Sequence, residues 1–473
     1  MNMNRRSFLL GGTAATASVV ASRATASACA CCGASKPALL GGTPVIPKAE
    51  QAAELDMFQW PRVNAAMRRA SDAVLVGCKM SANDVSLEFE EKFAMWQGTK
   101  YALSFPNGTT SLNAAMYAVG LGAGDEMICT SLTYWASCLG ALNLRARVVF
   151  CDVREDLEMD PASVEAAITP RTKAIMCVHY KSHPCDMDPI MAIARKHGLK
   201  VIEDCSHAQG GLYKGRKLGT IGDIAGMSCM TFKSFSIGEG GMMVTNDYEL
   251  YRRAIRFGHY ERIAKHWKPE ELEGTRNVPL GAMKNRLNQC AAAVGIEQLK
   301  KYDAECAEIT QCKEYFYRGI ADVKGLSKVY PVWENSNKAG WYSSVTHYDP
   351  AAFCGISADT FVDALKAETG ECCDYQFGHA CDFPLHTSSV FSTFDTYHSG
   401  RPVNFETMPA GLERERAKAE FPVASTIRER IFCEPWFKLF IPTQIDRYVE
   451  AVHKVAAAAP QLADWEKTHP RKA

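Results

Sequence analysis

The sequence predicts an α/β protein with a mainly parallel sheet covered by helices on both faces, followed by a smaller C-terminal α+β domain. Three observations support this prediction. The chain has 473 residues, of which 47% are apolar and 22% charged, so it is long enough for two domains around a large core. Helix-like and strand-like segments alternate from about residue 85 to residue 250. Beyond about residue 310 this alternation stops.

The alternating region contains segments with the length and composition of buried strands. These segments are 125–131, 146–153, 172–180 and 199–205. Helical periodicity is found in 109–122, 135–144, 160–168 and 188–198. Asp160 and Pro161 are a helix start signal, and Gly198 is a stop signal. The connections between these segments are short, which implies right-handed crossovers between parallel strands. We therefore expect the functional residues just after the strand ends.

The C-terminal region has a different pattern. A strand-like segment at 341–349 is followed by helices at 357–370 and 445–459. Residues 375–420 are rich in aromatic residues, Ser, His and Pro, and we expect a long loop there. The predicted division is a signal-like segment at 1–30, a large domain at 50–310 and a smaller domain at 311–473.

The overall charge argues against some classes of partner. The formal net charge is +0 and the sequence pI is about 7.1. Nucleic-acid and anionic-membrane partners usually require clustered Lys and Arg. We therefore expect small-molecule substrates and no nucleic-acid partner.

The N-terminal residues differ from the rest of the chain. Residues 4–10 read NRRSFLL, and a weakly apolar run with Ala-x-Ala sites follows. This pattern resembles a twin-arginine export signal, and the run is too polar for a stable membrane span. We expect a periplasmic or exported protein; the alternative is a disordered extension on a cytoplasmic protein. The sequence does not decide whether the segment is cleaved or lipid-modified.

Cysteines are unusually frequent, with nineteen in the chain. Cys129, Cys151, Cys177 and Cys229 lie in apolar strand-like segments, where we expect them to act as small core residues. The remaining groups of interest are the cluster Cys29, Cys31 and Cys32 and the pair Cys372 and Cys373. Neither group has the paired spacing of a zinc site, so no metal site is expected.

Asp204 and Lys233 are the first residues that indicate a catalytic site. Asp204 ends the strand-like segment LKVIED, and Lys233 follows the strand-like segment 226–232, so both should project from one edge of the sheet. Pyridoxal phosphate requires an acid beside its pyridine nitrogen and a lysine for its Schiff base. The lysine must be partly desolvated to react as an amine. A structural ion pair between Asp204 and an arginine is the alternative for these residues alone.

A possible phosphate site supports the cofactor hypothesis. The segment PNGTTSL, residues 106–112, places Gly108, Thr109 and Thr110 at the start of a helix, where backbone amides favour an anion. Ser228 could add a hydroxyl. Tyr134, just after a strand, could cover the cofactor with its ring, although plain core packing is an alternative.

The order and spacing of these segments resemble a known family. FPNGTTSLNAAMYAVGLGAGDEMICTSLTYWAS, HGLKVIEDCSHAQGGLYKGRKLGTIGDIAGMS and FKSFSIGEGGMMVTND are similar to motifs of the DegT/StrS sugar aminotransferases. The similarity continues through NRLNQCAAAVGIEQLKKYD to the last helix. It implies a fold type I enzyme in which pyridoxal 5'-phosphate binds to a large domain with a seven-stranded sheet.

The resemblance also implies roles for individual residues. Lys233 matches the lysine that forms the aldimine, and Asp204 matches the partner of the pyridine nitrogen. The other implied cofactor contacts are Gly108, Thr109, Thr110, Tyr134, Ser228 and His207, the last in a place where many members have Gln. Lys284 falls where many members have an Asn that reaches the phosphate in the neighbouring subunit, which implies a homodimer with shared active sites. The usual Tyr-Gly after the third strand is replaced by Lys181 and Ser182.

The implied activity is transfer of an amino group from Glu or Gln to a keto sugar or keto cyclitol, with Lys233 as Schiff-base anchor and proton shuttle. Two alternatives stay open. A dehydratase of the same family would carry His in place of the lysine, and Lys233 argues against it. An exported sugar-binding relative without catalysis is the other. The sequence does not identify the acceptor or decide between the two donors.

Overall fold

The structure is a computed structural model that describes residues 35–275, 278–281, 283–329, 333–371, 373–380, 383–388, 390–391 and 419–470. Lys36 and the described residues after it form one compact unit. The predicted signal at 1–30, Cys372 and most of the predicted loop at 375–420 lie outside the described residues.

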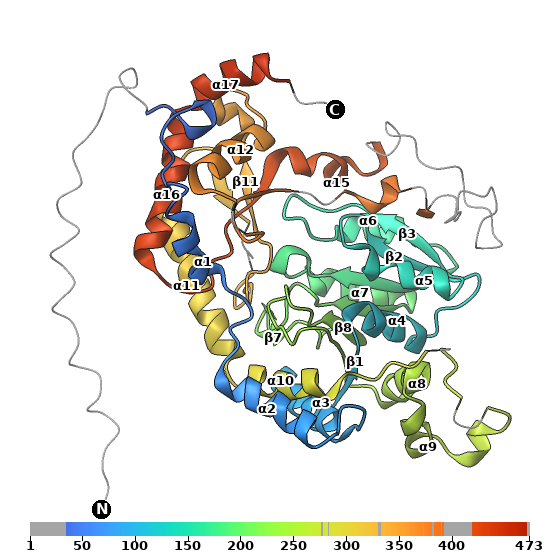
Figure 1. The fold of residues 1–473 in the computed structure, drawn as a ribbon. Coiled ribbons are helices and arrows are strands. Elements are labelled where there is room, and N and C mark those ends of the chain that lie inside the picture. Colours follow the sequence, from blue (N-terminus) through green and yellow to red (C-terminus); the bar gives the residue numbers. More distant parts are fainter. Residues whose placement is uncertain are drawn as a thin grey trace, which may run out of the picture. The chain divides into compact units, whose positions relative to one another are not determined.

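A seven-stranded sheet is the main feature of the described chain, and its strand order is β1-β9-β8-β5-β4-β2-β3 (Figure 1). The strands are β1 (Tyr101–Phe105), β2 (Glu126–Thr130), β3 (Arg147–Cys151), β4 (Thr172–Val178), β5 (Lys200–Asp204), β8 (Ile224–Ser228) and β9 (Gly241–Thr245). Only β9 runs against the others, because it pairs antiparallel with both β1 and β8 while the remaining pairs are parallel. The predicted mainly parallel sheet is confirmed.

Helices cover both faces of this sheet, as the sequence predicts. On one face lie α4 (Gly108–Ala118), α5 (Leu139–Asn143) and α8 (Tyr248–Gly258). On the other lie α3 (Asp84–Gln97), α6 (Pro161–Ala166), α7 (Met187–His197) and α10 (Gln289–Leu299). Further helices of this region are α2 (Ala65–Val76), which packs on α10, and the short α9 (Ile263–His266).

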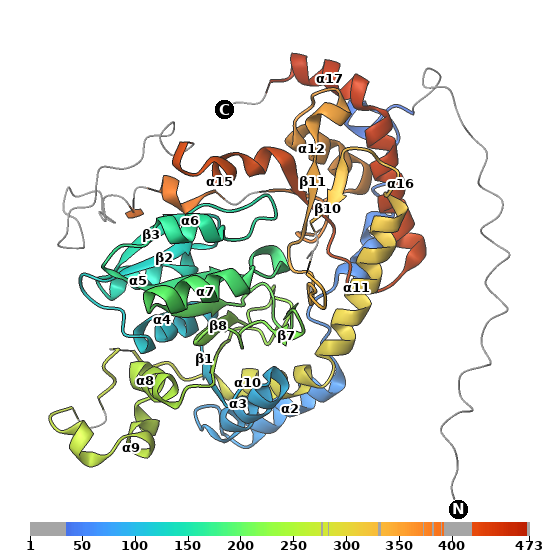
Figure 2. The same cartoon turned by 180° about the vertical axis from the view of Figure 1, so that it is seen from behind.

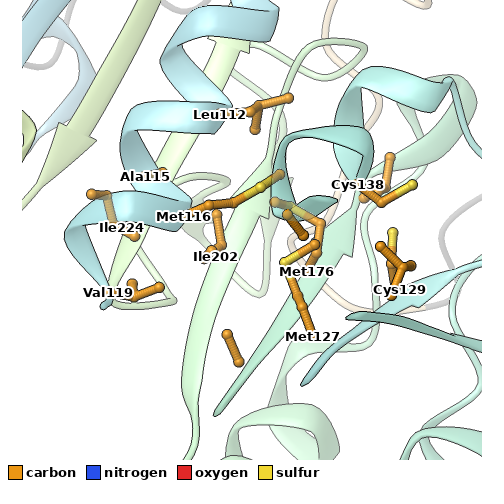
Figure 3. Packing of buried hydrophobic residues seen from close by; sticks show 14 of the residues in the cluster. Leu112, Ala115, Met116, Val119, Met127, Cys129, Cys138, Met176, Ile202 and Ile224 are labelled. Carbon is orange, nitrogen blue, oxygen red and sulfur yellow. The ribbon is translucent and has the colours of Figure 1, made fainter. Parts of the chain in front are cut away.

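The apolar strand sequences follow from this arrangement. In a strand, neighbouring side chains point to opposite faces, so a strand covered on both sides is apolar throughout. Met127 and Cys129 of β2 pack on the α4 side, and Ile128 packs on the α7 side. Figure 3 shows Met116 of α4 beside Ile202 of β5 and pointing toward Met176 of β4, in one apolar cluster with Leu112 and Met127. The sheet is therefore the core of the larger region.

The four cysteines of the apolar segments are core residues, as predicted. Cys129, Cys151, Cys177 and Cys229 are fully buried and free. Burial raises the pKa of the Cys129 and Cys177 thiols well above the usual value. These thiols stay protonated and act as small core side chains.

Two predicted elements are shorter in the structure. The expected helix at 135–144 is a 3-10 turn at Trp135–Ser137 followed by α5, because Cys138 has non-helical φ and ψ angles of −137° and −23°. The expected strand at 226–232 ends at Ser228. Beyond it, Cys229 donates its amide to Gly240 O and accepts from the amide of Ile237, which closes a loop that carries Lys233.

A second, antiparallel sheet has the order β10-β11-β13-β12. Its strands are β10 (Leu326–Lys328), β11 (Val345–Tyr348), β12 (Gly378–His379) and β13 (Ile431–Cys433), and a separate hairpin contains β6 (Leu212–Tyr213) and β7 (Arg216–Lys217). The helices near it are α1 (Leu55–Phe58), α11 (Tyr302–Gly319), α12 (Ala358–Thr369), α15 (Pro422–Thr426), α16 (Pro442–Ala457) and α17 (Ala459–Thr468).

The connection between the two sheets is helical. In Figure 1 and Figure 2, α11 runs from the neighbourhood of α10 to lie along α16. Because α11 crosses residue 310 without a break, the predicted domain boundary there stays a prediction. In the part of the chain that the structure describes, no helix combines the length and hydropathy that spanning a membrane would require.

Lys438 is an unusual residue in the core beside the second sheet. It is fully buried, and its Nζ lies against the rings of Trp436, Tyr375 and Trp60. The amine has no hydrogen-bond partner among the described residues. Burial, with a smaller contribution from the positive charge of Lys313, holds the pKa of Lys438 well below its usual value.

We predict that Lys438→Met stabilises the protein. An unsatisfied buried polar group costs about 1–3 kcal/mol, and Met keeps the chain length without the amine. Below the normal lysine pKa, Lys438 of the wild type is protonated in the unfolded chain but neutral in the folded chain. The free energy of unfolding therefore falls as the pH is lowered. The gain in Tm from Lys438→Met should therefore be larger at pH 7 than at pH 10.

Thermal unfolding at both pH values tests this, with the exposed Lys324→Met as the control. A loss of Tm in Lys438→Met at pH 7 would show that the buried amine contributes an interaction.

Candidate active site

A cavity of about 540 Å³ lies at the carboxyl ends of β5 and β8 and at the start of α4. Ligand sites of open α/β sheets occur at this edge. The lining residues used below are Asn107, Gly108, Thr109, Thr133, Tyr134, Ser137, Tyr180, Lys181, Asp204, Ser206, His207, Ser228, Lys233, Glu239, Tyr342 and Ser343. The cavity volume is in the range of small-molecule sites.

Asp204 is the last residue of β5 and is buried at the cavity wall. Its Oδ2 accepts a hydrogen bond from Ser137 Oγ at 2.8 Å, and its Oδ1 accepts one from the Ser206 amide at 2.9 Å. Because Ser137 Oγ donates to Asp204, its 2.8 Å contact with Thr133 is donated by Thr133 Oγ1. These contacts fix the orientation of the carboxylate.

Glu203, the neighbour of Asp204, points to the other face of the sheet. Its two oxygens accept from the amides of Gly219, Ile221 and Gly222 and from His179 Nε2, at 2.6–3.0 Å. His179 Nδ1 accepts from the Cys185 amide, which places the imidazole proton on Nε2. Burial alone would raise the pKa of Glu203, but His179 and the loop amides hold it below its usual value.

The start of α4 lies directly against the end of β8. A Cβ atom on Gly108 would come 2.5 Å from Ser228 Cβ, so only glycine permits this approach. Asn107 Oδ1 caps the helix by accepting from the amide and the hydroxyl of Thr110. The first amides of a helix have no acceptor within it, and Gly108 and Thr109 line the cavity. The geometry suits an anion such as phosphate.

Lys233 lies in the loop that follows β8 and is 9% exposed. Its amide donates to Met230 O, and its carbonyl accepts from Trp60 Nε1 at 2.9 Å. Its Nζ is 4.4 Å from the centroid of the Tyr342 ring. The backbone amide and carbonyl of Lys233 are therefore both held by hydrogen bonds, and Lys233 lines the cavity.

His207 packs on the same tyrosine, with ring centroids 4.6 Å apart. Burial, followed by the charges of Lys233 and Lys181, holds the pKa of His207 well below its usual value. The imidazole is neutral near pH 7, and its Nδ1 accepts from the Lys181 amide at 3.3 Å.

Most of the predicted site residues meet in this cavity. Those that line it are Gly108, Thr109, Tyr134, Asp204, His207, Ser228 and Lys233. Tyr134 is 53% exposed, and its ring lies beside that of Trp135. The Thr110 hydroxyl donates a hydrogen bond to Asn107 Oδ1. Lys284 is exposed, and its Nζ lies 5.8 Å from the centroid of the Tyr260 ring. The individual roles of all these residues stay predictions.

Several lining residues were not predicted from the sequence. Ser137 follows the predicted Tyr134 by three residues, within a segment that was interpreted only as a helix. Tyr342 and Ser343 fall in a segment interpreted as a strand of the smaller domain, but β11 begins only at Val345. Neither segment has a local pattern that indicates a ligand site.

The cavity fits pyridoxal phosphate. A carboxylate with fixed orientation suits the protonated pyridine nitrogen, and a buried amine suits the aldehyde. The Gly108 and Ser228 contact provides a close backbone surface at a helix start, which suits the phosphate.

The chain is similar to known aminotransferases. The sequence profile of the DegT/DnrJ/EryC1/StrS aminotransferase family matches residues 63–401. A putative L-glutamine:3-amino-2,3-dideoxy-scyllo-inosose aminotransferase of Micromonospora echinospora is 30% identical, over 89% of this chain and 97% of that protein. The GDP-perosamine synthase of Caulobacter vibrioides is 41% identical over 47% of this chain and 58% of that protein.

Solved structures give the same result. The aminotransferase from Psychrobacter cryohalolentis is 29% identical and has a TM-score of 0.70, over 85% of this chain and 99% of that chain. The chain therefore belongs to the DegT/DnrJ/EryC1/StrS aminotransferase family and is a pyridoxal-phosphate-dependent aminotransferase of fold type I.

Proposed function

We propose that this protein transfers an amino group from glutamine or glutamate to the keto group of a cyclitol or a sugar. The observation that carries the proposal is the placement of Lys233 and Asp204 in one cavity beside the start of α4. One relative is named for a glutamine donor and a cyclitol, and another is named for a nucleotide-linked sugar. The acceptor is therefore proposed as a class and not as one compound.

The residues of the cavity have separate tasks in this proposal. When bound, pyridoxal phosphate supplies an electron sink for the negative charge that develops at the α carbon of the donor. Asp204 keeps the pyridine nitrogen protonated, and Ser137 with the Ser206 amide holds that carboxylate in place. Gly108, Thr109 and Ser228 bind the phosphate, and Tyr134 covers the ring.

Lys233 is the proposed acid and base. With the cofactor bound, its Nζ would accept the proton from the donor α carbon and give it to C4′ of the cofactor, which is joined to that carbon through the amino nitrogen, so one amine performs both transfers. Neutral His207 lies beside the cavity without adding a positive charge. A dehydratase of the same family would need a histidine at position 233, and a relative without catalysis would not need the lysine.

We predict that Lys233→Ala abolishes the visible absorption band of the lysine-bound cofactor and lowers turnover by about 10²- to 10⁴-fold or more. In the wild type, glutamine or glutamate should bleach this band as the amino group is taken up. Absorption spectra of both proteins, with the exposed Lys173→Ala as the control, provide the measurement. A wild type that forms the band but is not bleached by either donor would support the non-catalytic alternative.

A homodimer with shared active sites is a further part of the proposal. Lys284 is exposed and does not line the cavity of its own chain, and the exposed apolar residues Leu280 and Met283 lie next to it in the sequence. An exposed apolar segment that carries a cation suits contact with a second copy and with its bound phosphate.

We predict that Lys284→Glu is inactive alone but complements Lys233→Ala. After mixing, half of the dimers would be mixed, and each would contain one intact site, so about a quarter of the wild-type activity should return. Activity of the mixture, compared with each variant alone, is the measurement. Sedimentation of the active wild type as a monomer would contradict the shared site.

Export through the twin-arginine route is proposed from the sequence of residues 1–30. This route carries folded proteins, which suits an enzyme that binds its cofactor before export. An exported enzyme would meet free sugars, cyclitols or glycan components.

We predict that a reporter fused to residues 1–35 is exported and that replacing Arg5 and Arg6 with Lys stops the export. The location of the reporter in cell fractions is the measurement. Export that persists in the double Lys variant would exclude the twin-arginine route.

A further inference from the structure

Residues 340–343 pass the cavity in an unusual backbone conformation. The φ angles of Gly340, Trp341 and Ser343 are 68°, 48° and 52°, in the left-handed region that residues with side chains disfavour. Such a conformation persists only where the surrounding structure holds it, and it often has a functional reason. Tyr342 lies between Trp341 and Ser343 and lines the cavity.

Close contacts fix this segment against the loop that carries Lys233. A Cβ atom on Gly340 would come 2.4 Å from Cβ of Ser234, the residue after Lys233, so only glycine permits this approach. The Gly340 carbonyl accepts a hydrogen bond from Trp436 Nε1 at 2.7 Å. Trp436 also packs on Trp60, with ring centroids 6.1 Å apart, and Trp60 binds the Lys233 carbonyl. The segment and the lysine loop are therefore held by the same pair of tryptophans.

The Tyr342 side chain is restrained by its neighbours. Its ring is half-buried and packs on the His207 ring, with centroids 4.6 Å apart. Trp436 meets the Tyr342 ring edge-on, at a centroid distance of 5.3 Å and an angle of 90°. The Tyr342 carbonyl lies 3.1 Å from Ser182 Oγ. The ring and the backbone of Tyr342 are thus both held in place.

The Lys233 amine lies over the face of this ring. Its Nζ is 4.4 Å from the centroid of the Tyr342 ring. The face of an aromatic ring is the negative end of its quadrupole, so it attracts an ammonium group at this distance. The face does not take up the proton, as a carboxylate would. The ring therefore favours the protonated state of the lysine without competing for its proton.

We propose that Tyr342 is a positioning residue for Lys233, whose ring holds the amine at the cavity wall and stabilises it while it carries a proton. The inference rests on the proposed function, in which the amine accepts a proton and then gives it up. Between these two transfers the amine is an ammonium group, and the ring face lies beside that charge. The strained conformation of residues 340–343 is then explained, because it fixes the ring at this place.

Other titratable groups also act on this amine. Those that line the cavity with Lys233 are Asp204 at the end of β5, Lys181 after β4, and His207, Glu239, Tyr134 and Tyr180. These groups stay the same when residue 342 is replaced by a second aromatic ring. A difference between two rings at position 342 is therefore assigned to the ring.

The test measures the protonation of Lys233 in the full chain after removal of the cofactor. A trace of acetic anhydride acetylates the neutral amine only, so the labelled fraction at a series of pH values has a midpoint that reports protonation. Residues 218–252 contain no other lysine, so mass spectrometry of this segment is specific for Lys233. Tyr342→Leu should lower the midpoint by about 0.4 to 1.5 pH units, which corresponds to the usual range of cation–π energies. Tyr342→Phe should keep the midpoint because it keeps the ring.

A graded series of rings guards against a folding failure in Tyr342→Leu. Mono-, di- and trifluorophenylalanine at position 342 keep the shape of phenylalanine but progressively withdraw negative charge from the ring face. These proteins should keep the Tm of Tyr342→Phe, while the labelling midpoint falls with each added fluorine. A midpoint that does not depend on the number of fluorines would overturn the proposal. An equal fall in Tyr342→Phe and Tyr342→Leu would also overturn it, because the effect would then belong to the hydroxyl.

The loaded enzyme provides a second readout. The rate constant for bleaching of the cofactor band at saturating glutamine should be lower in Tyr342→Leu by about 2- to 30-fold. The glutamine concentration that gives half of the maximal rate should change little, because the ring acts on the amine and not on the donor. A change confined to that concentration would assign Tyr342 to donor binding and overturn the proposal.

The proposed function and this inference fail in different ways. A wild type whose cofactor band is not bleached by glutamine or glutamate would remove the proposed function, but the labelling midpoints would still report the effect of the ring. A wild type that is bleached, with the same midpoint for every ring at position 342, would remove the inference alone.

Discussion

Two adjacent buried carboxylates at the end of β5 determine how the candidate site is built. Because strand side chains alternate, Glu203 and Asp204 point to opposite faces of the sheet. Glu203 is saturated by three loop amides and His179, which fixes the end of β4 and the loop before β8. Asp204 is thereby left to face the cavity with its orientation fixed. A shift of one residue in this strand would exchange the structural and chemical carboxylates.

The loop that carries Lys233 depends on contacts from several parts of the chain. Gln209 donates to the carbonyls of Ser206 and Ser228 and accepts from Ser234, so it joins the ends of β5 and β8 to this loop. Trp60 binds the Lys233 carbonyl and packs in the core beside the second sheet. The Lys233 amine is thus placed by both cores, which suits the two proton transfers that we propose for it.

The sequence predicts the parts of this protein that depend on local pattern. Strand periodicity located β2 to β5, and position at a strand end located Asp204 and, with the family motifs, Lys233. The site contacts that join distant residues were not predictable: Ser137 and Asp204 are 67 residues apart, and no local signal links them. The break at Cys138 and the early end of β8 depend on packing and loop closure, which propensity does not encode. Lys181 was visible as a departure from the family, but only the fold shows that it reaches the cavity.

The buried thiols have a consequence for the order of events in the life of the protein. Of the described cysteines, Cys78 and Cys354 are exposed, whereas most of the others are enclosed in the cores. A chain that folds in an oxidising compartment would expose all of these thiols to mispairing with one another. A chain that folds first encloses them before any oxidant arrives. The buried thiols therefore suit a chain that completes its folding in a reducing compartment, whatever compartment the finished enzyme later occupies.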